Sequence, residues 1–309
     1  MLTLKQLRYF EALSRLRHFG RAAQECAISQ PALSMKIQEL EARLGLALVE
    51  RRRNGVRLTS AGDEIAQRAR SILTSVRDLS DYARNAAGSL SGKLVLGAIP
   101  SIAPYLLPAA LPLVRTRHPA LELTLRETQT SILVAELLAG ELDTVLLSLP
   151  IEHPEIATLP LFTDRFVLAA PSDARFDRAR PLTPEILADE NLLLLEDGHC
   201  LRDQALNFCQ SARAMRDRFG ASSLATLVQL VANDYGITLL PEMAVPIEVG
   251  EDPRIAIWRF AEPQPCRSIG LAWRRTSPQA AGFMALGEIL AEVAAPSPAA
   301  RRNLSAPAP

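Results

Sequence analysis

Residues 19–62 read FGRAAQECAISQPALSMKIQELEARLGLALVERRRNGVRLTSAG and contain two short helical patterns followed by a basic hairpin pattern. The segment RAAQEC, residues 21–26, predicts the first helix, and residues 27–29 predict a tight turn. Ser29 is a good N-cap for the second helix, because its hydroxyl can accept a hydrogen bond from a backbone N–H, and Pro31 is tolerated in a first helical turn. One face of the second helix is apolar, with residues spaced by four, three and four: Leu33, Ile37, Leu40 and Leu44.

Two short helices joined by a three-residue turn are typical of helix-turn-helix DNA-binding domains, in which the start of the second helix reaches base edges in the major groove. There Gln30 is suited to adenine, and Ser34 to a base or a phosphate. Residues 46–59 alternate about Asn54-Gly55, which predicts a hairpin, and its arginines are placed to contact phosphate or the minor groove. The predicted DNA-contacting residues are Arg21, Ser29, Gln30, Pro31, Ser34, Met35, Lys36, Arg51, Arg52 and Arg53. The alternative is an amphipathic helical bundle with a solvated arginine cluster, which the order of the elements disfavours.

Helical patterns flank this stretch on both sides. Before it, apolar residues recur at helical spacing at Leu4, Leu7, Phe10 and Leu13. After it, residues 60–87 carry a heptad seam sustained for about three repeats, formed by Ile65, Ala69, Ile72, Val76, Leu79, Ala83 and Ala86. The seam packs within its own chain or pairs with a second copy. We expect pairing, because a dimer places two recognition helices about one DNA turn, ~34 Å, apart. The segment GSLSGK, residues 88–93, is expected to be a hinge.

Charge and proline are distributed unevenly along the 309 residues. The whole chain has 34 Lys+Arg and 34 Asp+Glu, so its formal net charge is zero. Residues 1–93 nevertheless carry a net charge of +7 and one of the 22 prolines, whereas the remainder carries −7. This predicts a basic helical module joined to an acidic module of different construction, so the neutral total does not exclude nucleic acid. No apolar run of about 18 residues and no secretory signal are visible, and we expect a cytoplasmic protein that does not bind membranes.

In the acidic module, short apolar runs alternate with helical stretches, which predicts mainly parallel α/β sheets. The expected strands are KLVLGAI, LELTLRE, DTVLLSL, FVLAAP, LLLLE, ITLLP, IAIWRF and SIGLAW. Residues 296–309 are of low complexity and are expected to be disordered. The sequence has no P-loop, dinucleotide-binding, H-E-x-x-H or G-x-S-x-G motif, and its four cysteines form no C-x-x-C pair. We therefore expect no cofactor and no metal.

The stretch LLLLEDGHCLRDQALNFC, residues 192–209, suggests reactive chemistry. A strand is expected to end before Asp197 and a helix to begin after it. With Asp197 as the N-cap, Cys200 occupies the third helical position, where backbone N–H groups and the helix dipole favour an anion. The neighbouring His199 and Arg202 can add positive charge, although Asp203 opposes them. Such surroundings favour the thiolate, which is the form that attacks a peroxide.

Cys209 adds a geometric constraint. If residues 200–209 form one helix, the two cysteines are separated by about 13.5 Å along the axis and by half a turn. A disulfide needs Cα atoms within about 7 Å, so a bond between Cys200 and Cys209 requires the helix to unwind. Reduced and oxidised protein then differ in shape, as a redox switch requires. The alternative for a cytosolic cysteine is a small buried hydrophobe, and that is our interpretation of Cys26 and Cys266.

Residues 19–62 closely resemble the winged helix-turn-helix of LysR-type transcriptional regulators, and the predicted dimerisation helix follows where that family has it. Residues 192–209, together with IPSIAPYLLP, ETQT and GITLLPEMAVP, resemble the hydrogen-peroxide-sensing OxyR group of the family. The resemblance implies an α/β protein overall, with a winged helix-turn-helix (1–59), a coiled-coil linker helix and hinge (60–92) and a periplasmic-binding-protein-like regulatory domain of two α/β subdomains (93–295). One subdomain would be residues 94–164 with 268–295 and the other residues 165–267, with a cleft between them.

The resemblance also implies a mechanism. Cys200 would be the peroxidatic cysteine, oxidised first to a sulfenic acid, and Cys209 would resolve it as a disulfide. Five residues would orient peroxide or stabilise the thiolate: Ser101, Thr130, His199, Arg202 and Asp203. Ser101 stands where the group usually carries threonine, so the hydroxyl is kept and the methyl is not. The implied partners are promoter DNA, RNA polymerase, further copies of the chain in a homodimer or homotetramer, hydrogen peroxide as the signal and thiol reductants for resetting.

Three functions fit these patterns. The first is a DNA-binding regulator, not an enzyme, in which peroxide drives a disulfide that changes tetramer geometry and promoter contacts to control oxidative-stress genes. The second is a LysR-type regulator whose cleft binds a small-molecule effector without redox chemistry. The third is a thiol peroxidase with an attached DNA-binding domain. We predict the first. Loss of two thiols per chain with stoichiometric peroxide distinguishes it from the second, and one slow cycle per chain distinguishes it from the third.

Overall fold

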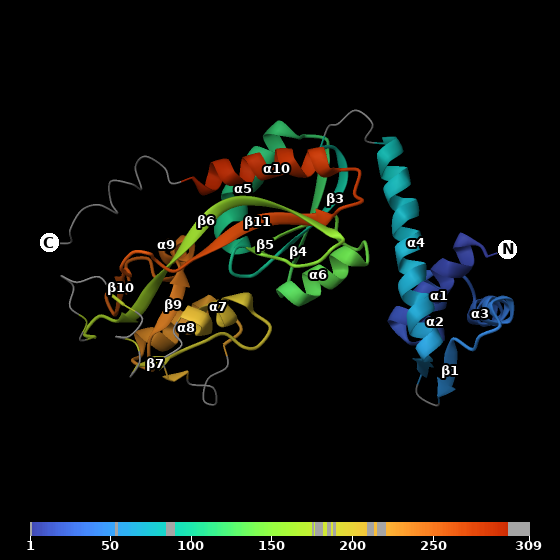
Figure 1. Ribbon diagram of the computed structural model, residues 1–309, viewed down its shortest axis with the longest axis horizontal. Coiled ribbons are helices and arrows are strands. Elements are labelled where there is room, and N and C mark those ends of the chain that lie inside the picture. Colours follow the sequence, from blue (N-terminus) through green and yellow to red (C-terminus); the bar gives the residue numbers. More distant parts are fainter. Residues whose placement is uncertain are drawn as a thin grey trace. The chain divides into compact units, whose positions relative to one another are not determined.

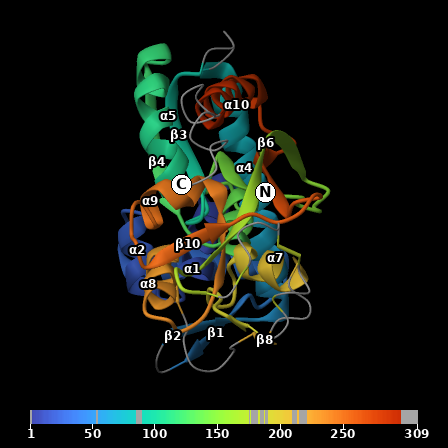
Figure 2. The ribbon, with the colours of Figure 1, turned by 90° about the vertical axis from the view of Figure 1, so that its left-hand side faces the viewer.

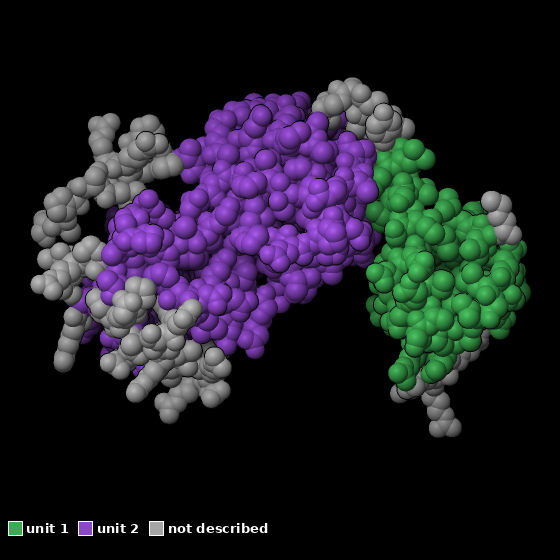
Figure 3. All heavy atoms as spheres, viewed as in Figure 1, with its two compact units in different colours: residues 1–86 green, residues 87–309 purple. Residues whose placement is uncertain are grey.

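The computed structural model describes residues 2–52, 55–84, 90–174, 176, 182–183, 187, 190–208, 213–214 and 221–295. The chain divides into two compact units, residues 1–86 and 87–309, coloured separately in Figure 3. The first unit has one hydrophobic core and the second has two. The segment 296–309, for which we predicted disorder, lies outside the described residues.

The first unit is a helix-turn-helix followed by a hairpin and a long helix. Its elements are α1 (Leu4–Leu16), α2 (Phe19–Glu25), α3 (Gln30–Leu44), β1 (Val49–Arg52), β2 (Gly55–Leu58) and α4 (Ser60–Arg84) (Figure 1). The hydroxyl of Ser29 accepts a hydrogen bond from the backbone N–H of Ala32 at 3.3 Å, which is the N-cap that the sequence predicts for α3. Gly45 ends α3 at a φ of 66°, a left-handed conformation that favours glycine. The predicted winged helix-turn-helix is confirmed.

Two local details of this unit differ from the prediction. Helix α2 begins at Phe19, not at Arg21, because His18 caps it: the imidazole Nδ1 accepts from the backbone N–H of Arg21 at 3.3 Å. In the hairpin, Gly55 pairs with Arg52 as the first residue of β2, so it is not the turn residue that the Asn54-Gly55 pattern predicts, and residues 53–54 lie outside the described part of the chain. Sequence patterns locate helices and hairpins more reliably than their end residues.

The second unit contains a mixed β-sheet flanked by helices. Among the described residues, the strand order is β10-β6-β11-β5-β3-β4, with β9 also pairing with β6. The strands are β3 (Gly92–Ala98), β4 (Leu121–Glu127), β5 (Thr144–Leu149), β6 (Ile156–Pro171), β9 (Thr238–Pro241), β10 (Ile255–Trp258) and β11 (Cys266–Arg274), and a separate pair is β7 (Asn191–Leu192) with β8 (Arg213–Ala214). The helices are α5 (Ala103–Arg117), α6 (Thr130–Leu138), α7 (Cys200–Phe208), α8 (Leu224–Ala232), α9 (Val245–Glu248) and α10 (Ala280–Ala294). Helices α5 and α10 pack side by side (Figure 2).

The prediction of mainly parallel sheets is wrong for the large sheet. Only β3 runs parallel to its neighbours β4 and β5, whereas β6 and β11 pair antiparallel with each other and with their other partners. An apolar run reports burial of both faces of a strand and not the direction of its neighbour, so the pattern could not distinguish the two arrangements. Of the expected strand LLLLE, only Leu192 lies in a strand. Residues 156–165, the first part of β6, were not predicted as a strand.

The second unit has two hydrophobic cores. One core is formed within residues 90–156 and 269–290, and the other within residues 166–260. Strand β6 contributes residues to both cores, whereas the core residues of β11 belong to the first core. Strand β6 passes from one core to the other near Asp164, which pairs with Arg267 of β11.

Candidate functional site

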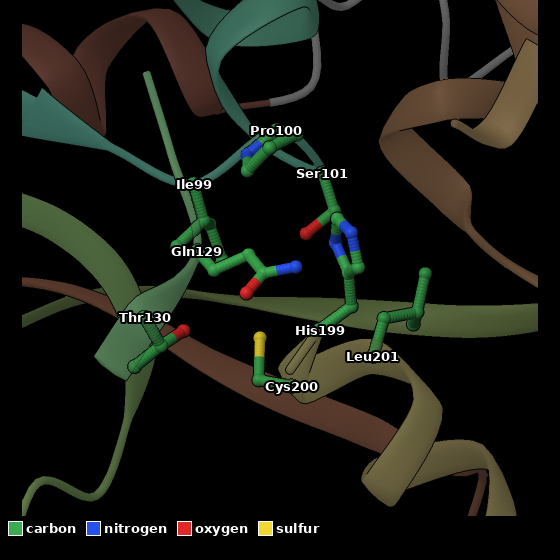
Figure 4. A pocket seen from close by; sticks show the side chains of 8 residues that line it. All are labelled: Ile99, Pro100, Ser101, Gln129, Thr130, His199, Cys200 and Leu201. Atoms are coloured by element: carbon green, nitrogen blue, oxygen red, sulfur yellow. The ribbon is translucent and has the colours of Figure 1, made fainter. Parts of the chain in front are cut away.

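A pocket lies where segments from both cores of the second unit meet. It is lined by three chain segments: residues 99–101 after β3, residues 129–130 at the start of α6 and residues 199–201 at the start of α7 (Figure 4). Its empty volume, including space open to solvent, is about 200 Å³. The pocket brings together four of the predicted site residues: Ser101, Thr130, His199 and Cys200.

Cys200 is the first residue of α7, not the third helical residue that the sequence predicted. The thiol is directed into the pocket (Figure 4) and is half-buried. Here it lies at the end of the helix where backbone N–H groups have no helical acceptor and the dipole is positive, which favours negative charge. Cys200 also packs against the first core, whereas Leu201 and Ala205 of the same helix belong to the second core. Helix α7 therefore contacts both cores.

The hydroxyl of Thr130 is buried and has no hydrogen-bond partner within the described part of the protein. It is directed into the pocket from the start of α6, on the side opposite α7 (Figure 4). A buried hydroxyl without a partner is unfavourable by about 1 to 3 kcal/mol. This side chain is thus placed to bind a small polar molecule next to the thiol.

Ser101 lies on the same pocket but its hydroxyl is already engaged. Its Oγ accepts from Arg267 Nη1 at 2.7 Å, and its carbonyl oxygen accepts from Arg267 Nη2 at 2.9 Å. The guanidinium of Arg267 also forms a buried ion pair with Asp164, with Nε to Oδ2 at 3.0 Å. Ser101 Oγ keeps its own hydrogen for donation. Through Arg267 and Asp164, the pocket is therefore tied to the point where β6 passes from one core to the other.

His199 is buried, with 9% of its surface exposed. Burial lowers its pKa from the usual 6.5, because the charged form loses hydration, and the nearby carboxylate of Glu196 opposes this shift. His199 is therefore neutral at pH 7. It can donate or accept a hydrogen bond in the pocket but does not supply the positive charge that we expected beside the thiol.

Arg202 and Asp203 do not line the pocket. Arg202 donates from Nη1 to the carbonyl oxygen of Leu195 at 2.8 Å, and its Nε lies 2.8 Å from Asp197 Oδ1. These contacts hold the turn that leads into α7. Two residues along a helix rotate a side chain by about 200°, which directs Arg202 away from the side that Cys200 occupies. Asp203 is exposed.

Sequence reasoning missed two glutamines. Gln129 lines the pocket, and its Nε2 donates to the carbonyl oxygen of Asp197 at 3.4 Å. Residue 198 has to be glycine for Gln129 to pack this closely, because a Cβ atom there would lie 2.4 Å from Gln129 Oε1. Gln204 lies on α7 four residues after Cys200, hence on the same face, and its Nε2 donates to Ser148 Oγ of β5 at 2.7 Å. Its Oε1 is buried without a partner among the described residues. Gln129 could have been identified because it precedes Thr130, and Gln204 because it follows Cys200 by four residues in a predicted helix.

The remaining cysteines lie away from this pocket or outside the described residues. Cys209 is among the residues whose structure is not described, and it directly follows Phe208, the last residue of α7. Cys26 packs against the core of the first unit, where burial raises the pKa of its thiol. Cys266 is exposed at the first residue of β11, in contrast to our interpretation of it as a buried hydrophobe.

In the first unit, the predicted DNA-contacting residues gather around α3. Arg21, Ser29, Gln30 and Pro31 are exposed, and Met35 is 57% exposed. Ser34 and Lys36 are half-buried, and Lys36 forms an ion pair with Glu39. Arg51 and Arg52 belong to β1, although their side chains lie outside the description, as does Arg53 entirely.

Helix α4 presents part of the predicted heptad seam to solvent. Ile72 is 45% exposed, Val76 36% and Leu79 69%. Ala69 of the same seam is buried. Three large apolar side chains exposed in succession along one helix are typical of a surface that binds another apolar surface.

The two units match two known sequence families. Residues 4–63 match the bacterial regulatory helix-turn-helix of the lysR family, and residues 87–295 match the LysR substrate binding domain. The chain therefore belongs to the LysR family of transcriptional regulators.

Within that family, the chain is similar to the OxyR group over almost its whole length. A probable hydrogen peroxide-inducible genes activator of Streptomyces viridosporus is 42% identical over 292 residues, which cover 94% of either chain. The structure of a full-length OxyR variant from Pseudomonas aeruginosa has a TM-score of 0.78 and 34% identity, covering 94% of this chain and 95% of that one. A hydrogen-peroxide-bound OxyR mutant from Corynebacterium glutamicum has a TM-score of 0.68 and 36% identity, covering 99% of this chain and 97% of that one.

In the part of the chain that the structure describes, no helix combines the length and the apolar character needed to cross a bilayer.

Proposed function

We propose that this LysR-type regulator senses hydrogen peroxide by oxidation of Cys200 and thereby controls transcription of oxidative-stress genes. The observation that carries the proposal is that one small pocket contains both the Cys200 thiol and the buried hydroxyl of Thr130, which has no hydrogen-bond partner among the described residues. Hydrogen peroxide has two O–H donors and two acceptor oxygens. Thr130 can bind one end of it while Ser101 donates to the other, which places an oxygen atom against the sulfur.

The proposed chemistry has two steps. The Cys200 thiolate attacks one peroxide oxygen, so that an S–O bond forms, the O–O bond breaks and hydroxide leaves and is protonated to water. The thiolate of Cys209 then attacks the Cys200 sulfur, the S–S bond forms and the S–O bond breaks, releasing a second water. Two thiols are oxidised by two electrons and one peroxide is reduced. A thiol reductant that reverses the disulfide resets the protein.

The second step requires α7 to change shape. Cys200 begins the helix and Cys209 follows its last residue, and eight residue steps from Cys200 to Phe208 advance about 12 Å along the axis. A disulfide needs Cα atoms within about 7 Å, so α7 unwinds when the bond forms. The unwinding breaks the contact between Gln204 and Ser148, which links α7 to β5. Because α7 packs on both cores, we propose that this change moves one subdomain relative to the other.

We propose the following assignments for the other predicted residues. His199 is a neutral hydrogen-bonding group in the pocket, and Arg202 holds the turn before α7 through Leu195 and Asp197. Asp203 has no contact with the pocket, and we assign it no role in binding peroxide. On DNA, the start of α3 enters the major groove with Gln30, Ser34 and Met35, and the arginines at 51–53 contact the backbone or the minor groove.

The proposed assembly is a homotetramer built from dimers. The exposed seam of α4 pairs with the same seam of a second copy as a coiled coil, which sets the distance between two recognition helices. We propose that the regulatory unit has the two-subdomain organisation of periplasmic binding proteins and that its shape sets the geometry of the tetramer. Oxidation then changes promoter contacts and the recruitment of RNA polymerase.

The alternative function, binding of a metabolite in the pocket without redox chemistry, has less support. Pockets for drug-sized ligands have volumes of about 300 to 1,000 Å³. Between the side chains that line it, the pocket beside Cys200 has room for little more than one water-sized molecule. It fits a molecule of two heavy atoms better than a metabolite.

The test is a footprint of the protein on its own upstream DNA, with and without peroxide. We expect Cys200→Ser to bind DNA as the reduced protein does and to keep the same footprint after peroxide. The matched control is Cys266→Ser, which removes an exposed thiol outside the pocket and should keep the response. A Cys200→Ser variant whose footprint still changes with peroxide would refute the proposed function.

A further inference from the structure

Helix α3 carries an ion pair on the face that is turned away from the core. Leu33, Ile37 and Leu40 are at most 1% exposed. Because these three residues pack into the core, the other side of the helix faces solvent. Lys36 Nζ lies 3.0 and 2.9 Å from the two carboxylate oxygens of Glu39, one helical turn later. The two side chains are 43% and 44% exposed. A carboxylate beside the residues that meet DNA requires an explanation, because phosphate repels it.

This ion pair is a weak contact that DNA can replace. Exposed pairs three residues apart on a helix contribute little to stability and are screened by salt. A lysine that neutralises a phosphate releases a condensed counterion, which is a favourable contribution to binding at low salt. DNA can therefore draw Lys36 away from Glu39. The Glu39 carboxylate is then left without its cation in the negative potential of the duplex.

Of the two amino groups that bases present in the major groove, cytosine N4 relieves this repulsion best, because adenine N6 lies beside the N7 acceptor, which repels a carboxylate. Cytosine presents its N4 amino group as a donor, which glutamate accepts, whereas guanine presents N7 and O6 to a lysine ammonium. Three residues along a helix advance about 4.5 Å, and one base step advances about 3.4 Å, so Lys36 and Glu39 can reach the same or adjacent base pairs.

We propose that Glu39 is a specificity-determining residue of the DNA interface. The pair of Lys36 and Glu39 accepts DNA that places a cytosine amino group at Glu39, and it weakens binding to all other sequences. This inference rests on the proposed DNA contact of α3. Glu39 would be an acidic residue that recognises a base, in an interface whose other proposed contacts are basic or neutral.

The experiment uses the full-length reduced protein, a pool of duplexes with a randomised centre and one duplex of mixed sequence. For Glu39→Gln we expect binding of the mixed duplex to be about 3- to 10-fold tighter at low salt, with a steeper dependence on salt by up to about 0.9 in log–log slope. Sequences selected from the pool should lose a G·C preference at one position of each half-site. The matched control is Glu64→Gln, which removes the same charge from an exposed ion pair with Arg68 on α4 and should match wild type in all three measurements.

Two results would overturn the inference. If Glu39→Gln has the affinity, the salt dependence and the selected sequences of the wild-type protein, Glu39 does not contribute to sequence recognition, while the proposed DNA contact of α3 is unaffected. Failure of the wild-type protein to select any sequence would refute the proposed DNA contact itself, and the inference with it. Circular dichroism of both variants checks that they are folded, as expected for substitutions of exposed side chains.

Discussion

Replacement of Thr130 with valine should make the protein more stable and less reactive. The hydroxyl of Thr130 is buried and has no partner in the part of the chain that the structure describes, and valine keeps nearly the same shape while removing the polar atom. Because a buried polar group without a hydrogen bond is unfavourable by about 1 to 3 kcal/mol, we expect the free energy of unfolding to rise by about 1 kcal/mol. For a unit of roughly 200 residues this corresponds to a Tm higher by about 2 to 4 °C.

The same substitution removes the group that we assign to peroxide binding. Loss of one donor that stabilises developing negative charge slows a reaction by about 10²-fold, equivalent to about 2.7 kcal/mol. We therefore expect the second-order rate of Cys200 oxidation to fall by about two orders of magnitude. Stopped-flow measurement of thiol loss gives this rate, and thermal unfolding of the reduced protein gives the stability.

Ser101→Ala is the matched comparison, since its hydroxyl lies on the same pocket but accepts from the buried guanidinium of Arg267 at 2.7 Å. Removal of that acceptor leaves a buried charged donor without a partner, so stability should fall by about 1.5 to 3 kcal/mol. The two variants thus change stability in opposite directions while both react more slowly. Thr130→Val with lowered stability and the wild-type oxidation rate would refute our reasoning about this pocket.

Three further predictions concern α7, His199 and the α4 seam. Gln204→Ala removes the contact with Ser148, so disulfide formation should become faster and the free energy of unfolding of the reduced protein should fall by about 1 kcal/mol; quenched thiol kinetics with an unchanged rate would show that this contact does not restrain α7. Because burial lowers the pKa of His199, the native state binds fewer protons there than the unfolded state, and its stability should decrease as pH falls below about 6.5. Urea unfolding across that range should show a smaller decrease for His199→Gln, and an equal decrease would contradict this. Leu79→Asp places a charge in the exposed seam, so sedimentation should show a smaller assembly, whereas wild-type sedimentation would argue against pairing through α4.

Local patterns in the first unit were sufficient to predict its fold. The cap at Ser29, the proline after it and the apolar spacing of Leu33, Ile37 and Leu40 each act within one or two helical turns. The hairpin likewise depends on a short loop. Such features are fixed by neighbours in the sequence, so a single sequence carries them. The end residues of α2 and of the hairpin differed because caps and docking contacts decide them.

The second unit depended on contacts that sequence patterns do not carry. Strand direction in the large sheet was predicted wrongly because burial pattern is the same for buried parallel and antiparallel strands. The bond between Ser101 and Arg267 joins residues 166 positions apart, and no local signal indicates it. Arg202 follows Cys200 closely in the sequence, yet helix geometry rotates its side chain away from the pocket. Four of the pocket residues could be predicted from the sequence, but Gln129 was missed, and none of the hydrogen bonds around the pocket could be predicted.

The most direct test of the account is a thiol count on the reduced full-length protein after one equivalent of hydrogen peroxide, with the bonded peptides mapped by mass spectrometry. We expect two of the four thiols to be lost per chain, in a disulfide that joins Cys200 to Cys209, while Cys26 and Cys266 stay reduced. Four intact thiols in protein whose DNA footprint has changed, or a disulfide that omits Cys200, would contradict it.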